Sequence, residues 1–114
     1  MNGQIAVLFA DLDNFKALNT KYSEPRIDQS LLPDAMHLVE GLIRMRGGAY
    51  KYGGDEYVLI LPNHDAIEGA GFAEQVRKAF EQFEFRVDTD LVHITVSPGI
   101  AVWPVHSTTC QDLL

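Results

Sequence analysis

Residues 52–61 constrain the fold of this chain more than any other stretch. Two glycines and two acids, Gly53-Gly54-Asp55-Glu56, directly precede an apolar run. Adjacent glycines favour tight turns, and a short apolar run bounded by a turn is typical of a buried strand. The sequence therefore predicts a β-hairpin whose turn carries carboxylates on a rigid support.

A second acidic cluster follows the apolar run near the start of the chain, where Asp11 and Asp13 flank Leu12. Two strand ends that each present carboxylates can together hold a divalent cation and a phosphate-bearing substrate. Asp11 and Asp55 are therefore candidate metal ligands. The simpler alternative is two solvated aspartates in turns.

The charge of the chain supports the same chemistry. The chain has 114 residues, which suits one domain, and a formal net charge of -7. This charge argues against broad nucleic-acid binding, which uses basic surfaces. A carboxylate ~4 Å from a phosphate oxygen repels it by about 4 kcal/mol at an effective dielectric of ~20. An acidic site can therefore hold a nucleoside triphosphate only with Mg²⁺ or Mn²⁺ between them.

Three segments together resemble the GGDEF family, the diguanylate cyclases. They are residues 11–19 (Asp-Leu-Asp-Asn-Phe-Lys-Ala-Leu-Asn), residues 53–57 (Gly-Gly-Asp-Glu-Tyr) and residues 94–101 (Ile-Thr-Val-Ser-Pro-Gly-Ile-Ala). Tyr57 stands where the family usually has Phe, and Pro98 is a second departure. The three segments occur in the family's order and cover nearly the whole chain, as a single domain over residues 1–114.

The expected elements follow from apolar periodicity and turn residues. Helices are expected over residues 14–22, 31–45 and 64–83, the last capped by Asn63, and a loop over 23–28. Strands are expected over residues 4–10, 49–52, 57–61, 84–87 and 91–102, where Pro98 requires a bulge or an edge position. This order suggests a ferredoxin-like α/β (α+β) palm sandwich, with the first strand adjacent and antiparallel to the hairpin. A further helix is expected to begin at Ser107 or Thr108.

The resemblance implies a metal site and a catalytic pair. Asp11 and Asp55 would ligate Mg²⁺ or Mn²⁺, and the carbonyl of Leu12 would add a ligand. Asp55 would also serve catalysis, with Glu56 as an auxiliary residue for metal or nucleotide. Strand alternation predicts that Glu56 faces away from Asp55. Asp13 is expected to point away from the metal site and to cap the following helix.

A second group of residues is expected to bind the nucleotide. Gly53 and Gly54 allow positive φ and the close approach of a phosphate or base to the backbone. The helix that Asn14, Phe15 and Lys16 open would offer its free N–H groups to phosphate, with Lys16 as an added cation. Phe15 is equally expected to belong to the core.

The resemblance also implies that Asn19 and Asp28 hydrogen-bond guanine. A carboxylate can accept from the N1–H and N2–H₂ groups of guanine, and adenine has no such pair of donors. The family's Gly-His-x-x-Gly-Asp pattern stands here as residues 23–28 (Ser-Glu-Pro-Arg-Ile-Asp), which keeps only the Asp. Guanine and adenine therefore both stay open as the base.

Together with the acidic clusters, the resemblance implies a metal-dependent nucleotidyl transferase that acts as a homodimer. It would condense two GTP into cyclic di-GMP and pyrophosphate. A minimal CRISPR-polymerase-like cyclase that makes cyclic di-adenylate from ATP, and a silent nucleotide-binding or partner-binding domain, are the alternatives. The family's N-terminal motif and its C-terminal cationic helix are not expected in this chain. The single Cys110 and the lack of a long apolar run or leader suggest a cytoplasmic domain.

Overall fold

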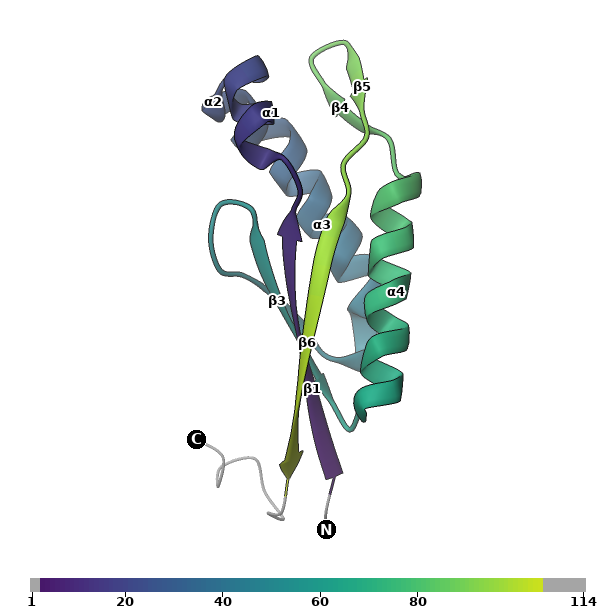
Figure 1. Ribbon diagram of the computed structural model, residues 1–114. Helices are drawn as coiled ribbons and strands as arrows, with labels where there is room; N and C mark the ends of the chain where they lie inside the picture. Colours follow the sequence, from purple (N-terminus) through teal and green to yellow (C-terminus); the bar gives the residue numbers. More distant parts are fainter. Residues whose placement is uncertain (1–2, 106–114) are drawn as a thin grey trace.

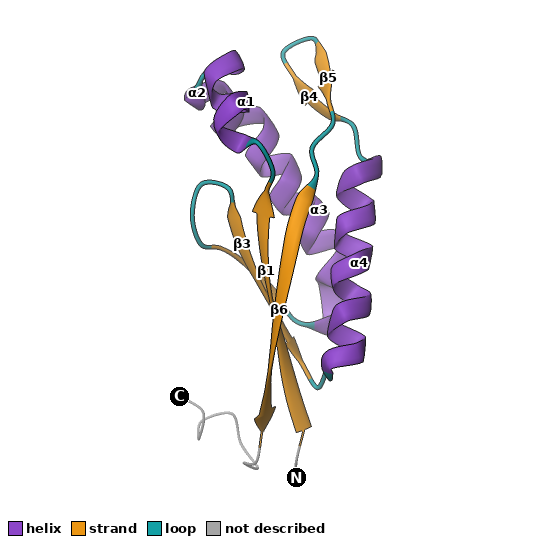
Figure 2. Cartoon of the chain, in the orientation of Figure 1, coloured by secondary structure: helices purple, strands orange, loops and turns teal. Residues whose placement is uncertain are grey.

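The computed structural model describes residues 3–105, which form one antiparallel sheet, a separate hairpin, two longer helices packed on one sheet face and shorter helices beyond one end of the sheet (Figures 1 and 2). The strands are β1 (Gly3–Leu12), β2 (Gly48–Lys51), β3 (Glu56–Pro62), β4 (Phe85–Val87), β5 (Asp90–Val92) and β6 (Val96–Val105). The helices are α1 (Phe15–Tyr22), α2 (Glu24–Arg26), α3 (Leu32–Ile43) and α4 (Ala66–Gln82). A π-helical turn, η1 (Ile27–Leu31), precedes α3, and a 3₁₀ turn, η2 (Arg44–Arg46), follows it.

The main sheet has the strand order β2-β3-β1-β6, and every neighbouring pair is antiparallel. β1 thus pairs directly with β3, which confirms the predicted contact between the first strand and the hairpin. The mixed architecture, an antiparallel sheet flanked by helices, confirms the predicted α+β fold class. β4 and β5 pair with each other as a two-stranded sheet.

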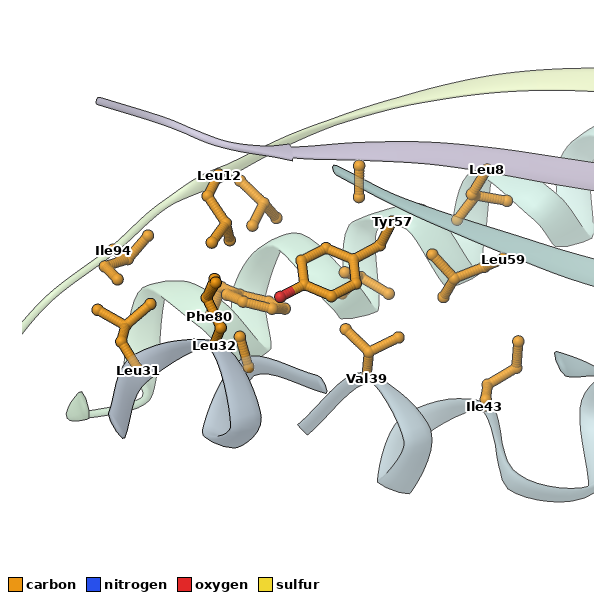
Figure 3. Packing of buried hydrophobic residues seen from close by; sticks show 14 of the residues in the cluster. Leu8, Leu12, Leu31, Leu32, Val39, Ile43, Tyr57, Leu59, Phe80 and Ile94 are labelled. Carbon is orange, nitrogen blue, oxygen red and sulfur yellow. The ribbon is translucent and has the colours of Figure 1, made fainter. Parts of the chain in front are cut away.

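Alternation along the strands places the core on one face of the sheet. Leu8 and Leu12 of β1 and Leu59 of β3 are buried and face α3 and α4 (Figure 3). The other face has no helix against it among residues 3–105, and there Phe9 and Trp103 are about half exposed. No helix in this part of the chain is long and apolar enough to cross a membrane.

Helix α4 lies close to the sheet because of one glycine. A Cβ added at Gly69 would come within 2.4 Å of Ile100 Cδ1 and 2.9 Å of Ala6 Cβ. The helix begins with a capping box, in which Asp65 accepts from the backbone N–H of Glu68 and the Glu68 side chain accepts from that of Asp65. The predicted cap at Asn63 is therefore wrong by two residues.

Several predicted bounds are corrected. The predicted loop 23–28 is helical, because Pro25 lies in the first turn of α2, where a missing N–H is harmless. The predicted helix over 31–45 ends at Ile43, so Met45 is not in the core but almost fully exposed. The predicted strand over 91–102 is two strands, β5 and β6. Pro98 lies on the edge strand β6, one of the two positions predicted for it. The helix start predicted at Ser107 or Thr108 lies outside the described residues.

Candidate functional site

Three carboxylates meet at one end of the sheet. Asp11 lies near the end of β1, Asp55 in the turn between β2 and β3, and Glu56 at the start of β3. One oxygen from each side chain lies within 4.8 Å of the other two. Carboxylate oxygens at such spacing are the ligands that Mg²⁺ and Mn²⁺ prefer, so the cluster can hold a divalent cation.

The sheet register explains why the carboxylates converge. Asp11 and Glu56 are directly paired across β1 and β3, and paired residues point to the same face. The backbone N–H of Leu12 donates to the carbonyl of Asp55 at 3.0 Å, which holds the turn against the end of β1. The prediction that Glu56 faces away from Asp55 is wrong, because alternation begins only at Glu56 and Asp55 still belongs to the turn.

A hollow of about 380 Å³ opens beside the carboxylates on the open sheet face. Phe9 and Val58 form part of its apolar wall, and Asp11, Glu56 and Tyr52 also line it. An apolar wall next to a few polar groups is typical of small-molecule sites. The hollow could therefore take a ligand that touches the acidic cluster at one end.

The two glycines of the turn do not use the positive φ that glycine allows. No glycine among residues 3–105 has a positive φ. An added Cβ would lie 3.5 Å from Glu56 Oε2 at Gly53 and 3.8 Å from Phe15 Cε2 at Gly54, both ordinary contact distances. Neither backbone conformation nor packing within the described chain therefore requires glycine at these two positions.

Asp13 has a different role from the predicted helix cap. Its carboxylate accepts from Thr95 Oγ1 and Ser97 Oγ, both at 2.7 Å, and its N–H donates to the Thr95 carbonyl at 2.9 Å. Asp13 therefore anchors the end of β1 to β6. The sequence offered no local signal for this role, because the partners lie more than 80 positions away.

The start of α1 lies directly after the carboxylate-bearing end of β1. Asn14 occupies the N-cap position in the left-handed region (φ 57°), and its side chain makes no capping hydrogen bond within the described residues. The first N–H groups of any helix lack helical acceptors, so those of Phe15 and Lys16 can serve an anion. Lys16 is exposed, whereas Phe15 packs against the core.

The two predicted base-reading residues lie on neighbouring elements. Asn19 is on α1 and the exposed Asp28 is on η1, and these two elements contact each other. The side-chain oxygen of Asn19 is buried and has no hydrogen-bond partner in the part of the chain that the structure describes. A buried acceptor without a partner is unfavourable, so a ligand that brings a donor would be favoured here.

Tyr57 carries the second buried polar atom of this kind. Its side chain is 1% exposed, and its hydroxyl, which points into the core on the side of Phe80 (Figure 3), has no partner within residues 3–105. Burial, with a smaller effect from the charge of Asp55, raises the pKa of Tyr57 to about 12. The departure from Phe was visible in the sequence, but the isolation of the hydroxyl was not.

Comparison with known proteins gives one family. The family model described as "Diguanylate cyclase, GGDEF domain" matches residues 1–114. The bifunctional diguanylate cyclase/cyclic di-GMP phosphodiesterase MucR of Pseudomonas aeruginosa is 32% identical over 111 residues, 97% of this chain and 16% of MucR. The diguanylate cyclase VdcA of Vibrio cholerae is 35% identical over 100 residues, 85% of this chain and 29% of VdcA. The chain thus spans less than a third of these relatives.

Solved structures share the fold. The FimX GGDEF domain from Pseudomonas aeruginosa superimposes with a TM-score of 0.85 at 14% identity, covering 96% of this chain and 67% of that one. The GGDEF domain of DgcB from Caulobacter crescentus, solved in complex with c-di-GMP, has a TM-score of 0.78 at 25% identity. It covers 88% of this chain and 60% of that one.

Proposed function

Because this chain belongs to the GGDEF domain family of diguanylate cyclases, we propose that it condenses two nucleoside triphosphates into a cyclic dinucleotide and pyrophosphate. GTP is the proposed substrate and cyclic di-GMP the proposed product. Relatives named as diguanylate cyclases, and a solved relative in complex with c-di-GMP, support this choice.

The convergence of Asp11, Asp55 and Glu56 is the observation that carries the proposal. Three hard oxygen donors within 4.8 Å of one another fit Mg²⁺ or Mn²⁺, and the carbonyl of Leu12 is proposed as a further ligand. When bound, such a cation neutralises phosphate charge and lowers the pKa of a hydroxyl group. Without a cation, the same carboxylates would repel a triphosphate.

The proposed reaction joins two nucleotides held by two facing copies of the domain. The 3′-oxygen of one nucleotide attacks the α-phosphorus of the other, the bond to the β-phosphate bridging oxygen breaks, and pyrophosphate leaves. The proton of the 3′-hydroxyl passes to the Asp55 carboxylate or to water. A second identical transfer closes the ring, which is why a homodimer is required.

The remaining predicted residues would hold the nucleotide. The N–H of the N-cap residue Asn14 and the first N–H groups of α1, at Phe15 and Lys16, would bind phosphate oxygens together with the Lys16 ammonium group. The turn at Gly53 and Gly54 would let the nucleotide approach the backbone. Packing within the described chain does not require glycine at either position, so the absence of side chains there is available to serve a ligand.

Asn19 and Asp28 would read the base. The unpartnered oxygen of Asn19 supports this assignment, because the N2–H₂ group of guanine could donate to it. Asp28 would accept from guanine N1–H. Adenine has no donor at either position, so GTP is expected to be preferred over ATP.

The experiment incubates the protein with Mg²⁺ and either GTP or ATP, and separates the products by chromatography. The expected result is cyclic di-GMP and pyrophosphate from GTP, with losses of at least about 100-fold for Asp11→Asn and Asp55→Asn, typical of removing charge stabilisation from a reacting phosphate. Glu40→Gln, an exposed acid on α3, is the matched control and should keep full activity.

Binding of Mn²⁺, measured by calorimetry, separates failure of the site from failure of the chemistry. Tight binding of Mn²⁺ and GTP without pyrophosphate release would indicate a silent nucleotide-binding domain. Cyclic di-adenylate as the main product would transfer the proposal to ATP. Loss of Mn²⁺ binding in Glu40→Gln but not in Asp55→Asn would contradict the assignment of the cation site.

A further inference from the structure

The hairpin of β4 and β5 (residues 85–92) stands apart from the main sheet and lies at the same end of the molecule as α1 and α2 (Figure 1). Its base is fixed to the core. Phe85 is fully buried, with its ring centroid 5.9 Å from that of Phe80 and 4.6 Å from that of Phe83. Val87 is fully buried as well. The hairpin is therefore a rigid support rather than a loose loop.

Two aspartates of the hairpin bind side chains of the helical segment opposite. Asp88 forms an ion pair with Arg26 of α2. Asp90 accepts a hydrogen bond of 2.8 Å from the hydroxyl of Tyr22, the last residue of α1. These interactions join residues 62 and 68 positions apart in the sequence.

In the sequence, both interactions lie between the two proposed base-reading residues. Tyr22 lies one helical turn after Asn19 on α1, and Arg26 lies two residues before Asp28 on η1. Between them the chain bends at Ser23, whose backbone has φ 81° and ψ 148°. The bend joins two short helical pieces, so the spacing of Asn19 and Asp28 depends on what holds those pieces.

The hairpin also packs on η1 directly. β4 contacts η1, and Ile27 and Leu31 of η1 are fully buried in the same cluster as Phe85 and Val87. A π-helical turn is rare and often occurs at functional sites. Within this turn Ile27 and Leu31 are buried, whereas Asp28 between them in the sequence is exposed.

We infer that the β4–β5 hairpin sets the purine selectivity of this domain by holding Asn19 and Asp28 at a fixed spacing, with Tyr22 and Arg26 as positioning residues. This inference rests on the proposed function. Hydrogen bonds discriminate between bases only where donors and acceptors are held in place. An exposed ion pair contributes little to overall stability, so removal of the interactions with the hairpin should affect base recognition more than folding.

The test compares GTP with inosine triphosphate, which lacks the 2-amino group, in Tyr22→Phe, Arg26→Ala and the double variant. We expect KM for GTP to rise about two- to fivefold in each single variant, the size of effect measured for exposed pairs. KM for inosine triphosphate and kcat for both should change much less, so the preference for GTP falls. Arg86→Ala removes a neighbouring exposed arginine on β4 and should change neither KM.

Exchange of the charges gives an independent check. Arg26→Asp combined with Asp88→Arg should restore most of the GTP preference that Arg26→Ala removes. Equal losses for both nucleotides, a fall in kcat alone, or no change in the double variant would overturn the inference. Tyr22→Phe keeps the ring and its packing, so it remains informative if Arg26→Ala does not fold.

The positioning role of the hairpin can also be measured without any enzymatic activity. If the unmodified protein neither binds nor converts GTP, the proposed function fails, and amide hydrogen exchange over residues 19–31 tests the hairpin alone. Faster exchange there in the double variant, with unchanged exchange in α4, supports the positioning role. Unchanged exchange in residues 19–31 overturns it.

Discussion

Replacement of Tyr57 by Phe should stabilise this domain, although it removes a hydroxyl group from a well-packed core. The Tyr57 side chain is 1% exposed and its hydroxyl has no partner within residues 3–105. A buried hydroxyl without a hydrogen bond costs about 1–3 kcal/mol of folding free energy. The void left by one oxygen, ~10–15 Å³, would cost about 0.3 kcal/mol. We therefore expect Tyr57→Phe to raise the free energy of unfolding by about 1–2.5 kcal/mol at pH 7.

The same substitution should show a characteristic pH dependence. Burial raises the pKa of Tyr57 to about 12 in the folded state, against 10.0 for a free tyrosine. Between these values the unfolded chain loses the proton that the folded chain keeps, so stability falls as the pH rises from 10 to 12. A difference of about two pKa units lowers the free energy of unfolding by about 3 kcal/mol in total as the pH rises from 10 to 12, and none of this loss occurs well below pH 10. Phe cannot ionise, so the advantage of Tyr57→Phe should widen by up to this amount above pH 10.

The assay is urea unfolding followed by circular dichroism at pH 7.5 and at pH 11. Comparing variants at each pH cancels the titration of the other groups. Tyr50→Phe, on the open sheet face, is the control and should shift stability by less than about 0.5 kcal/mol at pH 7.5. A destabilised Tyr57→Phe, or a difference between Tyr57→Phe and the unmodified protein that is the same at both pH values, would refute the reasoning.

Four further substitutions test other parts of the structure by thermal or urea unfolding. Ser23→Gly should stabilise by about 1 kcal/mol, because φ 81° strains Ser and suits Gly; no gain would mean that the bend is unstrained. Gly69→Ala should destabilise the protein by about 1–2 kcal/mol, because the added Cβ would clash with Ile100 and Ala6. Gly71→Ala should stabilise α4 by about 0.5–1 kcal/mol, because an added Cβ there has no atom within 4 Å. Equal shifts for the two variants would contradict the close approach of α4 to the sheet at Gly69. Asp55→Asn should raise the Tm measured without metal, because it relieves repulsion of about 1 kcal/mol per carboxylate pair. The same variant should lose the rise in Tm that Mn²⁺ gives the unmodified protein. A rise in Tm with Mn²⁺ that persists in the variant would exclude Asp55 as a ligand.

Several local features of the sequence were sufficient to predict structure. The glycine-rich turn before an apolar run predicted the β2–β3 hairpin, and the pairing of β3 with β1 followed from the family resemblance. Apolar periodicity predicted the helix over 64–83, and the buried face of α4 is formed by Phe72, Val76 and Phe80, which recur at helical spacing. Such signals succeed because turn chemistry and apolar periodicity act over a few residues.

Other features required partners that are distant in the sequence. Thr95 and Ser97 bind Asp13 across more than 80 positions, and no local pattern distinguishes this role from a helix cap. Similarly, no local pattern near Glu56 indicates where the turn ends and where the side chains of β3 begin to alternate between the two sheet faces. That boundary decides whether two or three carboxylates converge.

The sequence by itself determined the family, most of the helices and strands of the main sheet layer and the two strand ends that carry acids, because these depend on residue type and short-range spacing. Only the tertiary structure decided that Glu56 joins Asp11 and Asp55, that the Tyr57 hydroxyl has no partner among the described residues, and that the β4–β5 hairpin binds the segment between Asn19 and Asp28. The physical reason is that each of these outcomes is set by which side chains the packed sheet and helices bring within a few ångströms of one another.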